Sequence, residues 1–538
     1  MFLFYLIIIA MICEVFFKTK KSLHMLQQNL YNENNRYLKW VLKNSSSYFN
    51  IEIISIIMAV LGVFVIYDVN KYVILSQIVI LIVYCALTYK WRNKLKYEQT
   101  KKPLVFTKRV KRLVVTTTIL YLIPIIVLIL NTSSIRLVWL MILILSIMVY
   151  INDYIVFLSN VINFPIERCV YHYYKSKAQK KLKSMSNLKI VGITGSYGKT
   201  SSKNILGNIL NIKYNALPTP KNLNTYNGLI MTVNNYMDKF TDVFIAEMGA
   251  YVKGEIKGLC DLVHPKYGIL TTIGTAHLES FGSEQNIIDG KFELIESLPL
   301  DGIGVLNGDD PKQVSYKLKN KCEIIWIGID NHDVDIYASN IKCSSKGTKF
   351  DVFFKKENIK CSFETKLLGN HNVYNILAAL ALGHRFGIEI SDLQVAVKSV
   401  LPVEHRLELK RLGNFYMIDD AYNSNPVGAK NAVAVLKMMP GIKIVVTPGM
   451  IELGSKEDEL NEIFGEQIAE VADYVVLIGK EKTKPIKKGL ENKRYDSSNI
   501  IVYNDVREAY AFINSIKNDT DEDVYALFEN DLPDTYNE

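Results

Sequence analysis

The sequence predicts an α-helical membrane domain followed by α/β domains, namely a P-loop doubly wound central domain and a smaller Rossmann-like C-terminal domain. Three observations predict this fold. Long apolar runs lie before residue 165, a glycine-rich loop at 191–201 separates a strand from a helix, and short apolar runs then alternate with helical patterns. The predicted domains are a membrane domain at 1–165, a basic amphipathic linker at 166–184, a central domain at 185–402 and a C-terminal domain at 403–538.

Hydrophobic residues make up 49% of the 538-residue chain, and the excess lies in five apolar runs near the N-terminus. Three runs approach the ~20 residues that a helix needs to cross a bilayer. The first run has neither a basic segment before it nor a small-residue cleavage site, so a span is favoured over a removed signal peptide. We therefore expect about five transmembrane helices rather than buried core helices, at 2–17, 53–67, 72–89, 113–130 and 137–158.

Basic residues alternate between the loops that join these runs. The segments 18–43 and 90–112 are rich in lysine and arginine, whereas 68–71 and 131–136 are short and carry little charge. The positive-inside rule places the N-terminus outside and everything after residue 160 in the cytoplasm. The sequence thus predicts a multi-pass protein of the cell membrane whose catalytic domains are cytoplasmic.

The net charge of +9 follows largely from this loop bias, so it is no argument for nucleic-acid binding. Contact of the 90–112 loop with anionic membrane lipid is an alternative use of the same charge. The basic stretch Ile166–Lys183 predicts an interfacial helix that joins the membrane to the later domains. Asn152 and Asp153 interrupt the last apolar run, and we expect them near the cytoplasmic interface rather than at an intramembrane functional site.

The stretch V-G-I-T-G-S-Y-G-K-T-S at 191–201 has the form of a phosphate-binding loop, although Ile193 stands where the general Walker pattern has a glycine. It precedes a predicted helix at 202–210, so its backbone N–H groups would point to a polyphosphate at a helix N-terminus. Lys199 would neutralise the β- and γ-phosphates, and the Thr200 hydroxyl would bind Mg²⁺. The sequence therefore predicts an ATP site made by Gly195, Ser196, Gly198, Lys199, Thr200 and Ser201.

Short buried strands follow this loop in alternation with helices, which predicts a doubly wound, mostly parallel sheet. The segment 336–363 is richer in β-formers and predicts a side sheet. After Pro402 the alternation restarts, which indicates the second, smaller domain. The predicted strands are 243–246, 267–272, 304–306 and 324–328 in the first domain and 415–418, 443–447, 474–478 and 500–503 in the second, where helices are expected at 429–438 and 457–471.

Seven further motifs follow the phosphate loop: A-E-M-G-A-Y-V-K-G-E-I at 246–256, T-A-H-L-E-S-F-G-S at 275–283, N-G-D-D-P at 307–311, L-L-G-N-H-N-V-Y-N-I-L-A-A at 367–379, E-H-R-L-E at 404–408, I-D-D-A-Y-N-S-N-P at 418–426 and G-M-I-E-L-G at 449–454. In this order the series resembles the Mur ligases, and among them the MurF type, which adds a D-alanyl-D-alanine dipeptide to a cell-wall precursor. The resemblance covers about 185–505.

Two of these motifs supply residues suited to metal ions. Glu247 ends a strand beside the phosphate loop and would hold Mg²⁺ together with Thr200. His277 follows the next strand and is expected to hold a second Mg²⁺, so that two ions clamp the reacting carboxylate and the γ-phosphate. The resemblance implies that Lys291, fourteen residues after His277, is carbamylated by CO₂ and supports that second ion. A solvated surface lysine is the alternative.

The resemblance also assigns residues around the nucleotide and the substrates. Asn372 and Asn375 would contact adenine, whereas Arg406 and Asp420 would reach the ATP phosphates and ribose when the two domains close. The other interpretation of Asp420 and the residues after it is an Asx-rich turn before a helix. Residues expected to contact the substrate are Thr219, Asn222, Asn224, Tyr422 and Asn425, and those expected to act in catalysis are Lys199, His277, Lys291 and Arg406.

Together these features predict an ATP-dependent ligase that uses two Mg²⁺ ions and forms an amide through an acyl-phosphate. Its expected partners are a nucleotide- or lipid-linked cell-envelope precursor, an amino acid or dipeptide, and membrane lipid, with no nucleic acid. The alternatives are a membrane ligase that extends a surface poly-amino-acid and a membrane-tethered ATP-binding regulator without ligase activity. A regulator would need only the phosphate loop.

The chain departs from the MurF pattern at three places. Apolar runs occupy the position of the domain that binds the uridine diphosphate of the substrate. The acidic segment 526–533 stands where a strand leads into a Lys-Gly-Ser-type motif, which argues against contact with an anionic acceptor group there. Tyr251 and Val252 replace the more usual Asn-His.

Overall fold

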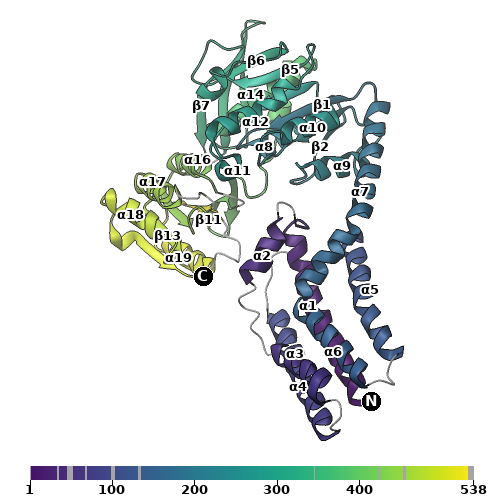
Figure 1. Cartoon of the computed structure of the whole chain (residues 1–538). Helices are drawn as coiled ribbons and strands as arrows, with labels where there is room; N and C mark the ends of the chain where they lie inside the picture. The colour runs from purple at the N-terminus through teal and green to yellow at the C-terminus, as the bar shows by residue number, and fades with distance from the viewer. Residues whose placement is uncertain are drawn as a thin grey trace. The chain divides into compact units, whose positions relative to one another are not determined.

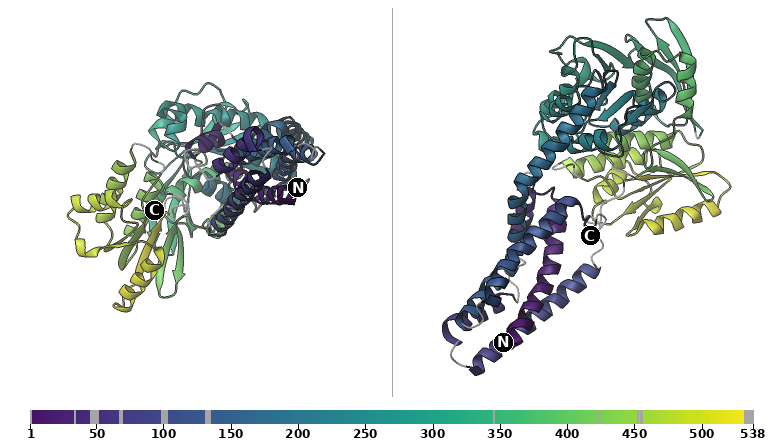
Figure 2. Two further views of the ribbon diagram at one scale, coloured as in Figure 1. Left: turned by 60° about the horizontal axis from the view of Figure 1, so that its bottom comes forward. Right: turned by 90° about the vertical axis from the view of Figure 1, so that its right-hand side faces the viewer.

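The computed structural model describes residues 2–32, 35–44, 52–66, 70–97, 103–130, 135–344, 346–421, 424–451, 453 and 456–530. The chain divides into two compact units, Met1–Tyr173 and Tyr174–Glu538 (Figures 1 and 2). The first unit is built of helices and the second is α/β. This division into a helical part followed by an α/β part agrees with the sequence prediction.

The helices of the first unit are α1 (Phe2–Gln28), α2 (Arg36–Asn44), α3 (Glu52–Leu61) with its π-helical continuation η3 (Gly62–Ile66), α4 (Asn70–Tyr97), α5 (Lys108–Leu130), α6 (Ile135–Tyr150) and α7 (Asn152–Ser184), which continues into the second unit. Among the described residues, three helical stretches are long and apolar enough to cross a membrane, namely Phe2–Gln28, Val73–Asn93 and Lys108–Val127. Counting the bent pair α6 and α7 as one span gives four, and Ile53–Phe64 is a shorter apolar helix. The number of five spans therefore stays a prediction.

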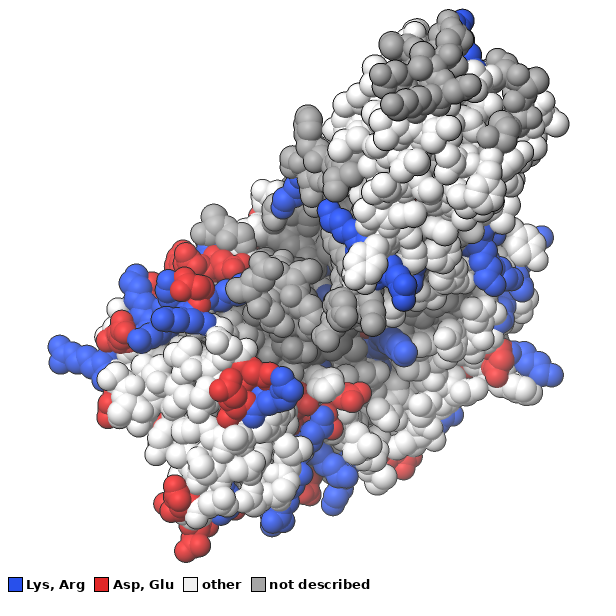
Figure 3. Space-filling view, turned by 90° about the horizontal axis from the view of Figure 1, so that it is seen from below, with Lys and Arg blue, Asp and Glu red and all other residues white. Residues whose placement is uncertain are grey.

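Large apolar side chains point outward from these helices. Ile9, Ile82 and Ile123 are 58%, 61% and 56% exposed. In the space-filling view of Figure 3, the lobe that the helices form is largely white, with few charged side chains along its length. An extended apolar surface of this kind is unfavourable in water and suits contact with lipid or another protein.

The predicted fifth apolar run and the predicted linker are not separate elements. The run 137–158 breaks at Ile151, because α6 and α7 meet there at 82°. The linker 166–184 continues α7 through Pro165 without a break. The bend was not predicted, because a uniformly apolar run does not reveal where a helix bends. The helix predicted at 166–183 is present as the last part of α7, and the domain bounds stay predictions.

The bend between α6 and α7 is held by polar side chains that pack between helices. Asn152 is 1% exposed; its side chain accepts a hydrogen bond from the Tyr121 hydroxyl at 3.0 Å and donates one to Ser22 Oγ at 2.9 Å. Lys18 Nζ donates to the Val149 carbonyl at 2.9 Å, in the last turn of α6. The Lys18 bond supplies a partner for a backbone carbonyl that the end of α6 leaves without an intrahelical bond, and the Asn152 bonds tie the start of α7 to side chains of α1 and α5.

The second unit begins with a nine-stranded sheet in the order β2-β3-β1-β4-β5-β6-β7-β8-β9. Its strands are β1 (Lys189–Thr194), β2 (Ala216–Pro218), β3 (Val243–Glu247), β4 (Tyr267–Leu270), β5 (Ile303–Asn307), β6 (Glu323–Gly328), β7 (Ile336–Ser344), β8 (Gly347–Phe354) and β9 (Ile359–Thr365). Its helices are α8 (Lys199–Leu210), α9 (Tyr226–Asn235), α10 (Glu255–Val263), α11 (Leu278–Phe281), α12 (Glu284–Glu296), α13 (Pro311–Val314), α14 (Asn370–Arg385) and α15 (Ile390–Ser399).

Helices cover both faces of this sheet. On β1, Val191 and Ile193 enter the core that α8, α14 and α15 complete, whereas Gly192 lies against Leu294 of α12 on the opposite face. Strands β2 to β7 pair in parallel, so the predicted doubly wound sheet is observed. The predicted side sheet at 336–363 is wrong, because β7 pairs with β6 and its antiparallel partners β8 and β9 extend the same sheet.

The C-terminal domain is a second sheet in the order β10-β11-β15-β12-β13-β14, with β10 antiparallel to β11. Its strands are β10 (Glu408–Leu412), β11 (Phe415–Asp420), β12 (Ile442–Thr447), β13 (Tyr474–Ile478), β14 (Ile500–Tyr503) and β15 (Val524–Glu529), and its α-helices include α16 (Pro426–Lys437), α17 (Glu457–Ala469), α18 (Lys484–Asn492) and α19 (Val506–Asn518). All four strands predicted here are present. The last strand in the sequence, β15, is fully buried between β11 and β12 and was not among the predicted ones.

Asp309, which follows β5, links the segment after β6 and helix α14. Its carboxylate accepts hydrogen bonds from the backbone N–H groups of Ile329 at 2.5 Å and Asn331 at 2.6 Å, and from the Tyr374 hydroxyl of α14 at 2.7 Å. Burial opposes ionisation, but these donors hold the pKa of Asp309 below its ordinary value. The N-G-D-D-P motif at 307–311 therefore has a structural task at the end of β5.

We predict that Asp309→Ala lowers the free energy of unfolding by about 2–3 kcal/mol, because several donors lose their acceptor. Thermal unfolding at neutral pH measures this. The wild-type advantage should disappear as the pH falls below about 4, since a carboxyl with a lowered pKa stabilises only while it is ionised. The matched control is Asp333→Ala, whose side chain is 93% exposed and pairs with Lys355; its effect on the free energy of unfolding should be much smaller than that of Asp309→Ala.

Candidate active site

The phosphate loop connects β1 to α8 and is built against the end of β4. Gly195 has φ +151°, and a Cβ there would lie 1.9 Å from Thr271 Oγ1. Gly198 has φ +81°, which L side chains rarely adopt. The Ser196 N–H donates to the Thr272 carbonyl at 2.9 Å, and Thr271 Oγ1 donates to the Tyr197 carbonyl at 2.6 Å. The two glycines thus let the loop approach β4 closely and still lead into α8.

Lys199, the first residue of α8, folds back over this loop. Its Nζ donates to the Gly195 carbonyl at 2.7 Å and the Ser196 carbonyl at 3.0 Å. Burial lowers its pKa to about 8, with Glu247 acting in the opposite direction and Arg406 in the same one. A bound polyphosphate would favour the charged form, so the loop, the helix N-terminus and this ammonium together fit a nucleotide phosphate chain.

Glu247 lies at the end of β3, directly beside the start of α8. Thr200 Oγ1 is 3.2 Å from each carboxylate oxygen of Glu247. A hydroxyl and a carboxylate that face one space are the hard oxygen donors that Mg²⁺ takes together with phosphate oxygens. The structure therefore brings together the two residues predicted for the first metal ion, and their chemistry fits that ion.

The carboxylate of Glu247 also has a partner that the sequence prediction missed. Lys203, one helical turn after Lys199, places Nζ 2.8 Å from Glu247 Oε2, and the side chains of Lys203 and Glu247 are each 2% exposed. Asn224 Nδ2 donates to Oε1 at 3.1 Å. The signal in the sequence was the i, i+4 spacing of the two lysines, which puts both on the same side of the helix.

His277 and Lys291 are near enough for the charge of Lys291 to act on the His277 imidazole. His277 precedes α11 with φ +61°, an uncommon backbone conformation for a non-glycine residue. Burial and the cations Lys291 and Lys199 lower its pKa to about 4, so its imidazole is neutral at physiological pH. Its ring lies 4.5 Å from that of Tyr251, one of the residues at which the chain departs from the MurF pattern.

Lys291 of α12 is 2% exposed, so the alternative of a solvated surface lysine is wrong. Its Nζ is 3.4 Å from the Ala250 carbonyl and 5.3 Å from the centre of the Phe281 ring. Burial, and then Lys199, lower its pKa to about 7. Lowering the pKa of Lys291 makes the unprotonated, nucleophilic amine accessible near neutral pH.

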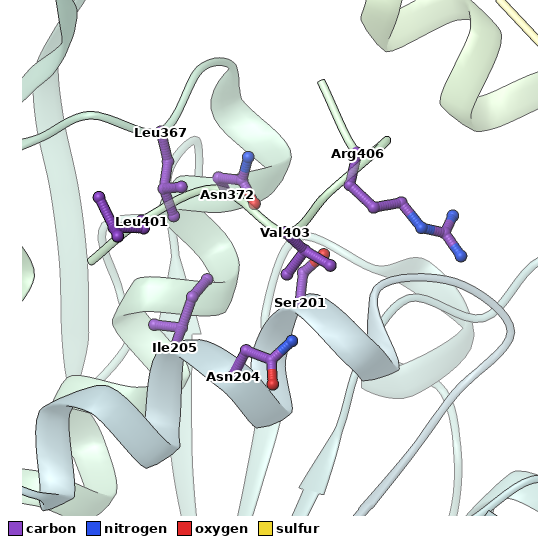
Figure 4. A pocket seen from close by; sticks show the side chains of 8 residues that line it. All are labelled: Ser201, Asn204, Ile205, Leu367, Asn372, Leu401, Val403 and Arg406. Atoms are coloured by element: carbon purple, nitrogen blue, oxygen red, sulfur yellow. The ribbon is translucent and has the colours of Figure 1, made fainter. Parts of the chain in front are cut away.

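The predicted adenine contacts occupy different positions. Asn372 lines a pocket beside α8, shown in Figure 4. Asn375 instead accepts a hydrogen bond from Ser202 Oγ at 2.7 Å and supports the first turn of α8. The pocket is lined by Ser201, Asn204 and Ile205 of α8, by Leu367 and Asn372, and by Leu401, Val403 and Arg406 of the segment that leads into the C-terminal domain. Four of these eight residues are polar or charged and four are apolar, so the pocket offers both hydrogen-bonding groups and apolar contact.

Asp420 ends β11 and forms a register pair with Glu529 of β15. Burial raises the pKa of Asp420 to about 6 against the effect of Arg406, and burial together with Asp420 raises the pKa of Glu529 well above its ordinary value. Ser424 Oγ donates to Glu529 Oε1 at 2.5 Å. The first part of the acidic segment 526–533 is thus a buried tie between strand ends; residues 531–533 lie outside the described part of the chain.

The residues predicted to contact the substrate have different positions in the structure. Thr219 Oγ1 accepts the Glu247 N–H at 3.2 Å, and Asn224 contacts the Glu247 carboxylate, so both support a residue that was predicted to hold a metal ion. Asn222 is exposed. Asn425 caps α16 by accepting the Gly428 N–H at 2.9 Å, which agrees with the Asx-turn alternative. Tyr422 lies outside the described residues.

Two family models match this chain. The Mur ligase middle domain matches residues 193–383, and the model described as Mur ligase, glutamate ligase domain matches residues 405–526, so together they cover more than half of the sequence. The chain belongs to the Mur ligases. Both matches lie in the α/β unit, and the first one contains the phosphate loop, Glu247, His277 and Lys291.

Among the Mur ligases, this chain is similar to the MurF type. It is 33% identical over 297 residues to the UDP-N-acetylmuramoyl-tripeptide--D-alanyl-D-alanine ligase of Bacillus subtilis, covering 54% of this chain and 63% of that one. The ligase of the same name from Escherichia coli is 31% identical, covering 54% and 65%. The chain thus spans less than two thirds of the length of these relatives.

Solved structures agree with this assignment. MurF from Acinetobacter baumannii superposes with a TM-score of 0.60 at 25% identity, covering 67% of this chain and 77% of that one. MurF ligase from Thermotoga maritima in complex with ADP superposes with a TM-score of 0.58 at 25% identity, covering 67% and 80%. The central and C-terminal domains of this Mur ligase therefore have the predicted fold.

We predict that Lys199→Ala reduces phosphate release from ATP by about a hundredfold or more, because the loop ammonium would neutralise the transferring phosphoryl group. Lys213→Ala is the control, since Lys213 Nζ also donates to a backbone carbonyl, that of Gly387, but away from the loop. Equal turnover by Lys199→Ala and wild-type protein would place the nucleotide site elsewhere.

Proposed function

We propose that this Mur ligase is an ATP- and Mg²⁺-dependent carboxylate–amine ligase of MurF type that acts on a peptidoglycan precursor at the membrane. The observation that carries the proposal is the convergence of Lys199, the Thr200–Glu247 pair and the His277–Lys291 pair around one phosphate loop. The relatives named above support the reaction class, since their names describe ligation of D-alanyl-D-alanine to a nucleotide-linked tripeptide.

The chemistry requires activation of a carboxylate, because its oxygen is a poor leaving group. In the first step a carboxylate oxygen of the precursor attacks the γ-phosphorus of ATP, the bond to ADP breaks, and an acyl-phosphate forms. The amine then attacks the acyl carbon, the carbon–oxygen bond breaks, phosphate leaves and the amine nitrogen loses a proton. Both steps concentrate negative charge, which Lys199 and the N-terminus of α8 are placed to stabilise. Mg²⁺ held by Thr200 and Glu247 would shield the phosphate oxygens.

We also propose that Lys291 is carbamylated. Its unprotonated amine attacks CO₂, a nitrogen–carbon bond forms, and loss of a proton leaves an anion. The described residues contain no group of three or more His, Cys, Asp or Glu side chains that could hold a metal ion. His277 by itself beside a lysine ammonium is a poor cation site, whereas His277 beside a carbamate supplies a neutral nitrogen and an anionic oxygen. This is the support for a second Mg²⁺.

The membrane assignment rests on the apolar exterior of the first unit and its candidate spans. We propose that the catalytic domains are cytoplasmic and that the helices replace a uridine-binding domain, so that the precursor is lipid-linked rather than held through a nucleotide. The surface poly-amino-acid ligase shares this chemistry with another substrate pair. A regulator without ligase activity would have no use for Lys291 buried beside His277, so we favour an enzyme.

The first test is phosphate release from ATP by the full chain in detergent, with UDP-MurNAc-tripeptide and D-alanyl-D-alanine. We expect release that depends on a carboxylate and an amine substrate together. Release with these two compounds means a MurF reaction on a nucleotide-linked acceptor, and release only with the lipid-linked intermediate supports the membrane-held precursor. ATP binding with no release in either case would contradict the MurF proposal. Unchanged KM for soluble precursor after deletion of 1–165 would contradict the membrane-held substrate.

We predict that Lys291→Ala loses more than about 99% of activity and that short-chain carboxylic acids partly restore it, because they supply the missing anion in the vacated space. In wild-type protein at limiting CO₂, activity should rise as the pH increases through about 7, since only the unprotonated amine reacts. Full activity in CO₂-free buffer, without rescue of the variant, would contradict the carbamate. Lys257→Ala, an exposed lysine of α10 paired with Asp261, is the control.

A further inference from the structure

Lys203 has two partners that belong to different parts of the site. Its ammonium lies 2.8 Å from Glu247 Oε2 and donates to the backbone carbonyl of Lys221 at 2.7 Å. Both side chains of the ion pair are almost completely buried. An exposed pair of this kind contributes little, but in a buried pair each charge depends on the other, so the positions of both groups are fixed.

Lys221 lies in the segment 219–224, the precursor loop, which is tied to the end of β3 at several further points. The Glu247 N–H donates to Thr219 Oγ1 at 3.2 Å, Asn224 Nδ2 donates to Glu247 Oε1 at 3.1 Å, and the Gly249 N–H donates to the Asn224 carbonyl at 2.8 Å. Lys221 itself has φ +49°, a left-handed conformation that a non-glycine residue keeps only when its surroundings hold it. The bond from Lys203 to its carbonyl is such a constraint.

We propose that Lys203 is a positioning residue that couples Mg²⁺ binding at Glu247 to the conformation of the precursor loop 219–224. That the loop binds the precursor rests on the proposed function, but the coupling between Mg²⁺ binding and the conformation of the loop does not. Lys203 shares its N–H donors between a carboxylate and a carbonyl. A metal ion bound to the Glu247 carboxylate neutralises part of its negative charge and repels the Lys203 ammonium. The ammonium then bonds more strongly to the Lys221 carbonyl. The precursor loop becomes more ordered as a result.

This coupling is reciprocal, because two ligands linked through one element change each other's affinity by the same factor. Mg²⁺–nucleotide should therefore tighten precursor binding, and bound precursor should tighten Mg²⁺ binding. Replacing Lys203 by methionine keeps the length and volume of the side chain but removes the charge and the donors. Lys203→Met should retain nucleotide binding, since the loop contacts of Lys199 remain, and should lose the communication between the two parts of the site.

The test is backbone hydrogen exchange of residues 221–225 in the detergent-solubilised full chain saturated with ADP, with and without Mg²⁺. In wild-type protein we expect Mg²⁺ to slow exchange of these amides several-fold. In Lys203→Met, calorimetry should still detect Mg²⁺–ADP binding, but Mg²⁺ should leave the exchange of the loop unchanged. Lys213→Met is the matched control, because it also removes a lysine bond to a backbone carbonyl and should keep the wild-type response.

Equal Mg²⁺-dependent protection in wild type and Lys203→Met, or none in wild type, would overturn the proposal. The second variant is Lys203→Gln, which keeps a polar group in the buried space. The Mg²⁺-dependent exchange of the loop is compared with wild type in whichever variant binds ADP. A residue with a purely structural role would raise exchange equally with and without Mg²⁺, which would also overturn it. With an active precursor, the KM for that precursor should rise about tenfold while the KM for ATP changes less than about twofold. Because the exchange experiment uses no precursor, failure of the MurF reaction leaves its outcome unaffected.

Discussion

The parallel pairing of β3, β1 and β4 is the constraint on which the rest of the site depends. Ile193 of β1 is in register with Glu247 of β3, and Thr194 with Leu270 of β4. Because the carboxyl ends of parallel strands lie at one edge of a sheet, the phosphate loop, the carboxylate and the segment that leads to His277 all begin there. A register shift on β3 would turn Glu247 to the other face and remove it from Thr200.

Positive charge is in excess around this edge of the sheet, which suits the anionic ligands proposed above. Lys199, Lys203 and Lys291 are cations or potential cations in an enclosed region, and the Glu247 carboxylate contacts the second of them. Burial lowers the pKa of Lys199 and Lys291 and the pKa of His277, so the protein alone holds these groups under mutual repulsion. A polyphosphate beside Lys199, and an anionic carbamate at Lys291, would relieve that repulsion. The same imbalance makes Lys203 sensitive to whatever binds Glu247.

In the C-terminal domain, by contrast, acidic groups lie close together. Asp420 and Glu529 face each other across neighbouring strands, and burial raises the pKa of both carboxyls, with the charge of Asp420 adding to the rise at Glu529. The described part of the acidic segment, residues 526–530, belongs to or directly follows the buried strand β15 and is therefore not only a surface loop. It ties together the ends of β11 and β15, and Asn530 adds a bond to the Gly449 carbonyl at 2.7 Å beyond β12.

The sequence by itself determined the order of helical and α/β parts and the phosphate loop with its strand and helix, and its motifs, with the family resemblance for Lys291, pointed to Glu247, His277 and Lys291 as candidate site residues. These follow from local patterns: glycine at positions with unusual φ, apolar periodicity, and motifs read along the chain. Only the tertiary structure decided the bend at Ile151, the central place of β15, the burial of Lys291 and the partnership of Lys203 with Glu247 and Lys221. Each of these depends on contacts between residues far apart in the sequence, and the burial that shifts a pKa or pairs a lysine with a carboxylate exists only after the elements have packed together.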